Sequence, residues 1–286
     1  MVRSLTFRRF AFLTLLAAGG VFVDAKVLPR WFPQAFGGVW GGLAAPDNAN
    51  VPASLRDLPV VVIKGKRDDG PVAILLSGNG GWWGIDDGIA EGLARAGVTT
   101  IGLNSLAYFI HRRSPEEVAA AIDRMAAAIG PGRPVVLVGY SFGADIAATI
   151  YARLSDDLRA RIRQVSLLGL SREADYAVGF MKVAGGRRGT IPAVAAIDGP
   201  HIQCFHGADE GARSGCNDVD AGKVQVVEVP GGHHFDGDYD RIASLILDGM
   251  PSPPPNDPIR YAGMDRFAWL AHPAGMDLQA GKHRND

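Results

Sequence analysis

One short motif constrains the fold of this 286-residue chain more than any other feature. Residues 139–143 read Gly-Tyr-Ser-Phe-Gly, which matches G-x-S-x-G. The motif follows an apolar run, 134–138, and precedes residues 142–154, whose apolar positions have helical spacing. In this context it marks a sharp strand-to-helix turn that raises a nucleophilic serine at the carboxyl edge of a sheet. We therefore predict Ser141 to be a nucleophile; the alternative is a serine that only caps the helix.

Strand-length apolar runs alternate with helical segments over most of the remaining chain. The runs are apolar throughout, which is typical of strands that are buried on both faces. The expected strands are 58–63, 72–77, 98–103, 134–139, 165–170, 201–205 and 224–229, and the expected helices are 85–96, 114–129, 142–154 and 239–247. This alternation predicts an α/β fold with a mostly parallel central sheet and helices on both faces, in one domain spanning residues 58–249.

Charge and cysteine content exclude several classes of protein. The chain has 29 Lys and Arg against 30 Asp and Glu, so it lacks the basic excess that neutralises phosphates, and we expect no nucleic-acid partner. A hydrophobic fraction of 47% excludes a disordered chain. Two cysteines are too few for a disulfide-dense scaffold or a four-cysteine zinc site, and we expect neither a metal nor a cofactor.

The first 25 residues are typical of an export signal. Three arginines, at positions 3, 8 and 9, precede the uncharged apolar run 10–23, which is shorter than the roughly 20 residues that cross a bilayer. Cleavage is expected after Ala25, and an uncleaved inner-membrane anchor is the alternative. We predict a periplasmic protein with a lead-in over residues 26–57 and a proline-rich, poorly ordered tail over residues 250–286. In that oxidising compartment Cys204 and Cys216 are expected to form a disulfide.

A nucleophilic serine needs a histidine base with an acid behind it. In the α/β-hydrolase fold, which we predict here, the acid follows the serine along the chain and the histidine comes last. His233 and His234 lie between the last strand and the last helix; we predict His234, which directly precedes an aromatic residue, as the base, with His233 as the alternative. The acid should follow the strand that ends at Phe205, where we predict Glu210, with Asp209 as the alternative.

Two backbone N–H groups are needed to hold the oxyanion that forms during acyl transfer. One is expected from Phe142, directly after the serine, and the other from Asn79 in the glycine-rich loop 77–83. This loop lacks G-x-x-x-x-G-K-[ST], which argues against nucleotide binding. Trp82 and Trp83 in the same loop are candidate walls for an acyl or glycerol chain, and core packing of either is the alternative.

Several segments together resemble the bacterial AcvB/VirJ virulence-protein family. They are Ser-Gly-Asn-Gly-Gly-Trp-Trp at 77–83, Asn-Ser-Leu-Ala-Tyr-Phe at 104–109, Arg-Ser-Pro at 113–115, Gly-Tyr-Ser-Phe-Gly-Ala-Asp at 139–145, Leu-Gly-Leu-Ser at 168–171 and Pro-Gly-Gly-His-His-Phe-Asp-Gly-Asp-Tyr at 230–239. The resemblance covers residues 60–247 and implies a periplasmic α/β-hydrolase-like protein that hydrolyses lysyl-phosphatidylglycerol to amino acid and lipid. The family usually has an acid in place of Asn79 and an aspartate in place of Asn104.

The residues agree with this chemistry, since a serine–histidine–acid site cleaves carboxylic esters through an acyl-enzyme. A cationic lysyl group should be met by acidic side chains, among which Asp145 is the candidate for substrate binding. Further carboxylates on or near the motifs are Asp86, Asp87, Asp236 and Asp238. The expected partner is an aminoacyl-phospholipid at the membrane surface. Alternatives are another periplasmic carboxylesterase or peptidase, or a non-catalytic accessory protein of a type IV secretion system; the oligomeric state stays open.

Overall fold

The computed structural model describes residues 50–68, 70–178 and 188–251. The expected export signal, most of the expected lead-in and nearly all of the expected tail lie outside these residues. The described elements run from a short 3-10 turn, η1 (Ala53–Leu55), to a helix, α9 (Tyr239–Asp248). Within these ranges no helix is both long and apolar enough to cross a membrane.

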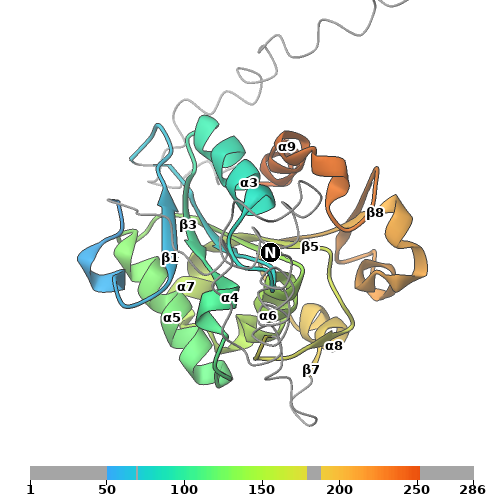
Figure 1. The fold of residues 1–286 in the computed structure, drawn as a ribbon, viewed down its shortest axis with the longest axis horizontal. Helices are drawn as coiled ribbons and strands as arrows, with labels where there is room; N and C mark the ends of the chain where they lie inside the picture. The colour runs from blue at the N-terminus through green and yellow to red at the C-terminus, as the bar shows by residue number, and fades with distance from the viewer. Residues whose placement is uncertain (1–49, 69, 179–187, 252–286) are drawn as a thin grey trace, which may run out of the picture. The chain divides into compact units, whose positions relative to one another are not determined.

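A twisted, mostly parallel sheet forms the centre of the described chain (Figure 1). Its strand order is β1-β3-β2-β4-β5-β8-β9, and β1 alone of these runs antiparallel to its neighbour, β3. The strands are β1 (Val60–Ile63), β2 (Val72–Leu76), β3 (Thr99–Leu103), β4 (Val135–Tyr140), β5 (Ile162–Leu168), β8 (His201–Gly207) and β9 (Gln225–Val229). A separate antiparallel pair is formed by β6 (Glu173–Ala174) and β7 (Arg188–Gly189).

Helices cover both faces of the sheet, as the sequence predicts. One face is covered by α3 (Gly84–Arg95) and α9, which lie side by side in Figure 1. The other face carries α5 (Pro115–Ala128), α6 (Phe142–Ile150), α7 (Asp156–Arg161) and α8 (Thr190–Ala195), with the single turn of α4 (Ser105–Tyr108) beside them. Each face therefore has its own apolar core, separated from the other by the strands.

Burial explains why the apolar runs form central strands. All five residues of β2 and all six of β4 are buried, so neither strand has a face that contacts water.

The sequence also explains why α5 begins at Pro115, directly after Ser114. Ser114 Oγ accepts a hydrogen bond from the N–H of Glu117 (3.1 Å), and the Glu117 carboxylate accepts one from the N–H of Ser114 (2.7 Å). This reciprocal cap satisfies two N–H groups that a helix leaves without partners.

Strand topology brings the carboxyl ends of β4, β8 and β9 to one edge of the sheet. The segments that follow these three ends contain Ser141, Glu210 and His233, respectively. Because the four strands from β4 to β9 are parallel neighbours, residues that are distant in the chain meet at this edge.

Candidate active site

Ser141 occupies the sharp turn that the sequence predicts between β4 and α6. Its backbone has φ 53° and ψ −117°, a region that costs a non-glycine residue about 1–3 kcal/mol. Both flanking positions need glycine because neither has room for a side chain. A β-carbon at Gly139 would lie 2.3 Å from the carbonyl oxygen of Gly143, and one at Gly143 would lie 2.0 Å from that of Leu76.

A chain of two hydrogen bonds connects Ser141 to an acid through a histidine. The Nε2 atom of His233 lies 2.8 Å from Ser141 Oγ, and its Nδ1 atom lies 2.7 Å from Oε1 of Glu210. A carboxylate can only accept, so Nδ1 carries the proton, and Nε2 is left to accept the proton of the serine hydroxyl. This is the arrangement that a serine nucleophile requires of its base.

The histidine in this position is His233, not the expected His234. The chain turns tightly here, with the N–H of Phe235 donating to the carbonyl of Gly232 (2.9 Å) and Phe235 fully buried at φ 53°. The two imidazole planes are consequently 79° apart, and only one ring points to the serine. Gly169 is the signal that sequence reasoning missed, because a β-carbon there would lie 2.6 Å from the His233 ring.

Glu210 is held in place by hydrogen bonds to both carboxylate oxygens. While Oε1 contacts His233, Oε2 accepts a hydrogen bond from the N–H of Gly207 (2.8 Å). Burial alone would raise the pKa of Glu210, but the hydrogen bonds from His233 and Gly207 outweigh it, and the pKa lies below its ordinary value. Asp209, the alternative acid, is exposed; its N–H donates to the carbonyl of Gly231 (2.9 Å) and so fixes the loop.

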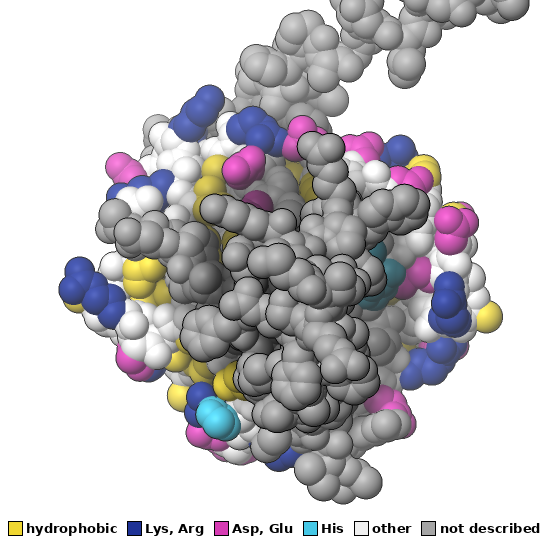
Figure 2. Space-filling model, in the orientation of Figure 1, with side chains coloured by type: hydrophobic (Ala, Val, Ile, Leu, Met, Phe, Trp, Pro, Cys, Tyr) yellow, Lys and Arg dark blue, Asp and Glu magenta, His cyan; other side chains and the backbone are white. Residues whose placement is uncertain are grey.

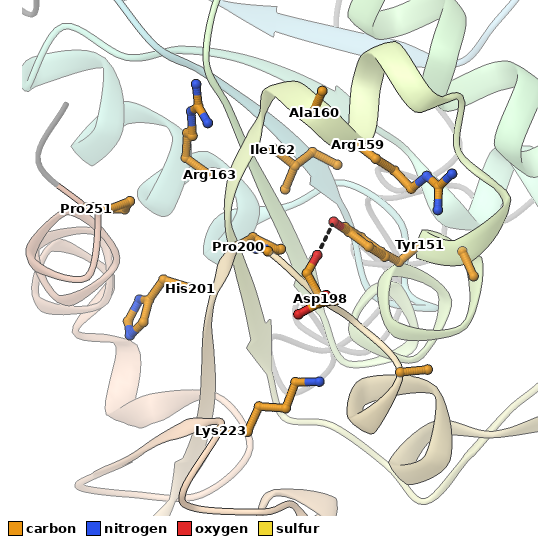
Figure 3. Close-up of a pocket in the computed structure, with 13 residues that line it drawn as sticks. Tyr151, Arg159, Ala160, Ile162, Arg163, Asp198, Pro200, His201, Lys223 and Pro251 are labelled. Atoms are coloured by element: carbon orange, nitrogen blue, oxygen red, sulfur yellow. Dashed lines mark hydrogen bonds between the residues drawn. The ribbon is translucent and has the colours of Figure 1, made fainter. Parts of the chain in front are cut away.

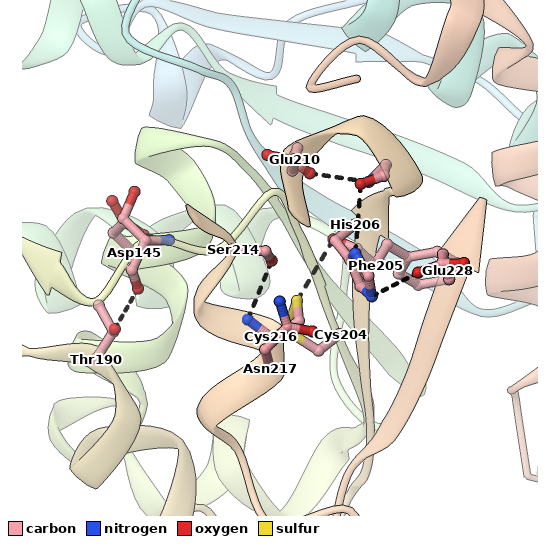
Figure 4. The surroundings of a disulfide bond; sticks show 12 residues. Asp145, Thr190, Cys204, Phe205, His206, Glu210, Ser214, Cys216, Asn217 and Glu228 are labelled. Atoms are coloured by element: carbon pink, nitrogen blue, oxygen red, sulfur yellow. Dashed lines mark hydrogen bonds and ion pairs between the residues drawn. A yellow bond between two sulfur atoms is a disulfide. The ribbon is translucent and has the colours of Figure 1, made fainter. Parts of the chain in front are cut away.

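The predicted disulfide between Cys204 and Cys216 is confirmed, with an S–S distance of 2.06 Å and Cα atoms 5.5 Å apart. Cys204 belongs to β8 and Cys216 to the 3-10 turn η5 (Gly215–Asp218), so the bridge closes the loop that carries Glu210 (Figure 4). The N–H of Gly215 donates to the carbonyl of Leu170 (2.8 Å), which fixes the same loop to the segment that follows β5. The acid is thus positioned by a covalent link as well as by hydrogen bonds.

The loop after β2 lies against Ser141, where the oxyanion site was expected. A β-carbon at Gly78 would lie 3.6 Å from that of Ser141 and 3.2 Å from the Tyr140 ring. Asn79 follows directly and is exposed. Phe142 is the first residue of α6, and the first N–H groups of a helix have no partner within it. The places of Phe142 and Asn79 are therefore compatible with the predicted pair of donors, which stays a prediction.

The two tryptophans of this loop differ in their surroundings. Trp82 is 4% exposed, donates its indole N–H to Asp87 (2.6 Å), and packs so closely on β3 that a β-carbon at Gly102 would lie 1.8 Å from its ring. Trp82 is therefore a core residue, which corrects the expectation of a substrate wall. Trp83 is 40% exposed and lies edge to face with His234, with ring centroids 5.5 Å apart. Of the pair, Trp83 is the one placed beside the site.

Two expected acidic contacts have structural roles instead. Asp145 is buried, and its carboxylate accepts a hydrogen bond from the N–H of Ser171 (2.8 Å). Asp86 is fully buried and accepts the N–H of Trp83 (3.2 Å) at the start of α3. Burial raises the pKa of Asp86 well above its ordinary value, because the charged form is disfavoured away from water. Asp145 and Asp86 therefore do not form the acidic entrance that was expected.

A cavity of about 820 Å³ lies at the opposite edge of the sheet (Figure 3). Its lining includes Ile162 and His201, which begin β5 and β8, whereas Ser141, Glu210 and His233 follow strand ends. The basic side chains around this cavity, Arg159, Arg163 and Lys223, point in different directions in Figure 3. In the described ranges, no group of three or more His, Cys, Asp or Glu side chains is placed to hold a metal ion.

Comparisons with known proteins agree with the geometry. A family model described as bacterial virulence protein (VirJ) matches residues 70–253. A thioesterase domain from the curacin biosynthetic pathway has a TM-score of 0.50 and 18% identity, and the match covers 66% of this chain and 95% of that one. An α/β-hydrolase-family protein from Desulfitobacterium hafniense has a TM-score of 0.50 and 14% identity, with 65% and 98% covered. No curated protein matches the chain. The similar structures show the α/β-hydrolase fold.

Proposed function

The chain belongs to the VirJ family of bacterial virulence proteins, and from that premise we propose that it is a serine hydrolase that cleaves the aminoacyl ester of lysyl-phosphatidylglycerol. The observation that carries the proposal is the hydrogen-bonded chain from Ser141 through His233 to Glu210 at the carboxyl edge of the sheet. Packing alone does not explain why these three residues, which come from three different loops, are hydrogen-bonded to one another.

In the proposed reaction Ser141 Oγ attacks the carbonyl carbon of the ester. His233 Nε2 takes the hydroxyl proton, and Glu210 stabilises the imidazolium ion that results. The backbone N–H groups of Phe142 and Asn79 hold the oxyanion. When the tetrahedral intermediate collapses, His233 returns its proton to the glycerol oxygen, and phosphatidylglycerol leaves. Water then attacks the acyl-enzyme with His233 as base, and the amino acid is released.

The proposed substrate fits this machinery chemically. The ammonium group of an aminoacyl ester withdraws electrons from the neighbouring carbonyl, so a two-donor oxyanion site suffices. The disulfide fits an exported protein, and we place the reaction at the periplasmic surface of the inner membrane. A two-chain lipid does not readily leave its bilayer, so the enzyme would act there. Removal of lysine returns a net negative charge to the headgroup and alters the surface potential.

The direct test is release of lysine from lysyl-phosphatidylglycerol in mixed micelles by purified protein. Wild type should release it, and Ser141→Ala and His233→Ala should not, since loss of a triad member costs up to about a millionfold in turnover. Circular dichroism should show that both variants are folded. Hydrolysis of simple esters without release of lysine would keep the serine hydrolase and eliminate this lipid. Absence of any Ser141-dependent hydrolysis would contradict the proposal and favour a non-catalytic accessory role in secretion.

A further inference from the structure

A second histidine lies beside the proposed triad without belonging to it. The ring of His234 is exposed, and its centroid is 6.0 Å from that of His233. His233 uses both ring nitrogens, on Glu210 and Ser141. His234 uses only Nδ1, which lies 3.0 Å from the hydroxyl oxygen of Tyr140. Among residues 50–68, 70–178 and 188–251, no group forms a hydrogen bond with its Nε2 atom.

The Tyr140 hydroxyl determines which nitrogen of His234 carries the proton. It lies 3.0 Å from His234 Nδ1 and 3.2 Å from the backbone carbonyl oxygen of His233. A carbonyl oxygen can only accept, so the hydroxyl satisfies it by donating its single proton there. His234 Nδ1 then donates to the hydroxyl oxygen, and all three atoms are satisfied. In this arrangement the outward Nε2 atom of His234 carries a lone pair and is a hydrogen-bond acceptor.

His234 is also kept uncharged by its surroundings. Partial burial and the neighbouring His233 lower the pKa of His234, so the neutral ring prevails near pH 7. Burial raises the pKa of Tyr140, so its hydroxyl keeps the proton that the arrangement needs. The base and its neighbour therefore have separate tasks: His233 accepts the proton of Ser141, and His234 presents an acceptor beside it.

Trp83 contributes a second group that attracts cations. Its ring is 40% exposed and lies edge to face with His234, at 5.5 Å between centroids. Its backbone is held at the beginning of α3 by the buried carboxylate of Asp86. The face of an indole ring attracts an ammonium group electrostatically, and tryptophan does so best among the aromatic residues.

Two of the carboxylates that were expected to meet a cation are engaged elsewhere. Basic and acidic side chains are interspersed over the part of the described surface that is visible in Figure 2. The carboxylate of Asp145 is engaged within the fold, and that of Asp86 is buried. Neither of these two carboxylates is free to meet a cation, which leaves a role for uncharged acceptors and aromatic rings beside Ser141.

We propose that His234 Nε2 and the Trp83 ring receive the ammonium group of the substrate's acyl part, so that the site prefers aminoacyl esters to uncharged esters of the same shape. The inference rests on the serine-hydrolase function proposed above and adds the residues that select the aminoacyl group. With the ester carbonyl at Ser141, the α-ammonium group is only two bonds from the carbonyl carbon. The ring of His234 lies beside the ring of His233, which contacts Ser141, with the two ring centroids 6.0 Å apart, so a group this close to the carbonyl carbon is near both rings.

A matched pair of soluble esters tests this preference. The p-nitrophenyl esters of alanine and isobutyric acid differ only in that a methyl group replaces the ammonium group. We measure the ratio of kcat/KM for the alanyl ester to that for the isobutyryl ester, at a pH where the α-amine is protonated. In His234→Phe the ratio should fall at least about tenfold, as expected for loss of a hydrogen bond to a charged group. In Trp83→Leu, which alters an exposed ring, it should also fall.

His111→Phe is the control, since His111 is exposed and lies on a different loop. Its ratio should equal that of wild type. If both esters lose rate equally in His234→Phe, this histidine only supports the turn that carries His233, and the inference is wrong. An unchanged ratio in both His234→Phe and Trp83→Leu would overturn it as well. If wild type hydrolyses neither ester, or if Ser141→Ala hydrolyses both, the proposed hydrolase mechanism itself fails and the inference fails with it.

Discussion

Replacing Glu210 by glutamine is expected to disable the site by moving the proton on His233. In the wild type one carboxylate oxygen accepts from the N–H of Gly207 (2.8 Å) and the other accepts from His233 Nδ1 (2.7 Å). Glutamine has one oxygen, and the backbone N–H of Gly207 can be satisfied only by that oxygen. The amide NH₂ must then face His233, where it can donate only if Nδ1 has lost its proton. The proton moves to Nε2, which can no longer accept the serine hydroxyl.

The expected loss in kcat is about ten-thousandfold, the size seen when a triad acid is replaced by its amide and the wrong tautomer results. This corresponds to about 5.4 kcal/mol of activation free energy. The assay is hydrolysis of a p-nitrophenyl ester at saturating substrate, with Asp209→Asn as the matched control on the adjacent exposed carboxylate. Asp209→Asn should stay within a few-fold of wild type. Less than a tenfold loss in Glu210→Gln, or an equal loss in Asp209→Asn, would refute the reasoning.

Three further substitutions test other parts of the structure. Replacing Cys204 and Cys216 by serine should lower the free energy of unfolding by about 3 kcal/mol, because the bridge closes a short loop; urea unfolding with and without reductant checks this, and identical curves for wild type would contradict it. Asp86→Asn should become more stable relative to wild type as pH rises above 3.8, because the pKa of Asp86 is higher in the folded state than in the unfolded chain. The contribution of Asp86 to the stability of the wild type is therefore fully present below the pKa of the unfolded state and is lost as pH rises toward the pKa of the folded state. Asparagine does not titrate, so the variant has no such loss. A stability difference that is flat with pH would show that Asp86 is ionised in the fold. Gly169→Ala should reduce kcat more than 100-fold, because its β-carbon would displace the His233 ring and its φ of 66° disfavours alanine; full activity would show that the ring has room to move.

The central strands and the turn at Ser141 could be predicted from the sequence, because the residues of each segment favour the same local structure that the whole fold requires there. Continuous apolar runs require burial on both faces, and the glycines on either side of the serine permit one tight geometry. The disulfide could also be predicted, because the expected export signal implies an oxidising compartment and the chain has one pair of cysteines. By contrast, the short helices α4, α7 and α8 were missed: with four to six residues each, they depend on packing rather than on a periodic pattern.

The choice between His233 and His234 could not be made from the sequence. It depends on a turn in which Phe235 and Asp236 have φ of 53° and 51°. Non-glycine residues rarely adopt such values, so this turn could not be predicted from the residue types. The same holds for Trp82 and Trp83, where the beginning of α3 decides which ring is buried. The close approach of the His233 ring to Gly169 distinguishes the two histidines, but it can be recognised only when the positions of the strands are known.

His233, the proposed base, follows the most exposed strand of the main sheet. β9 is an edge strand, paired only with β8 and largely exposed along its length, and the segment that follows it carries His233. Ser141, in contrast, follows a fully buried strand in the interior of the sheet. Edges open locally at a lower free energy than whole domains unfold. Catalysis should therefore fail at denaturant concentrations that leave the circular dichroism signal intact, so that the loss of turnover measures the fraying of one strand rather than the collapse of the fold.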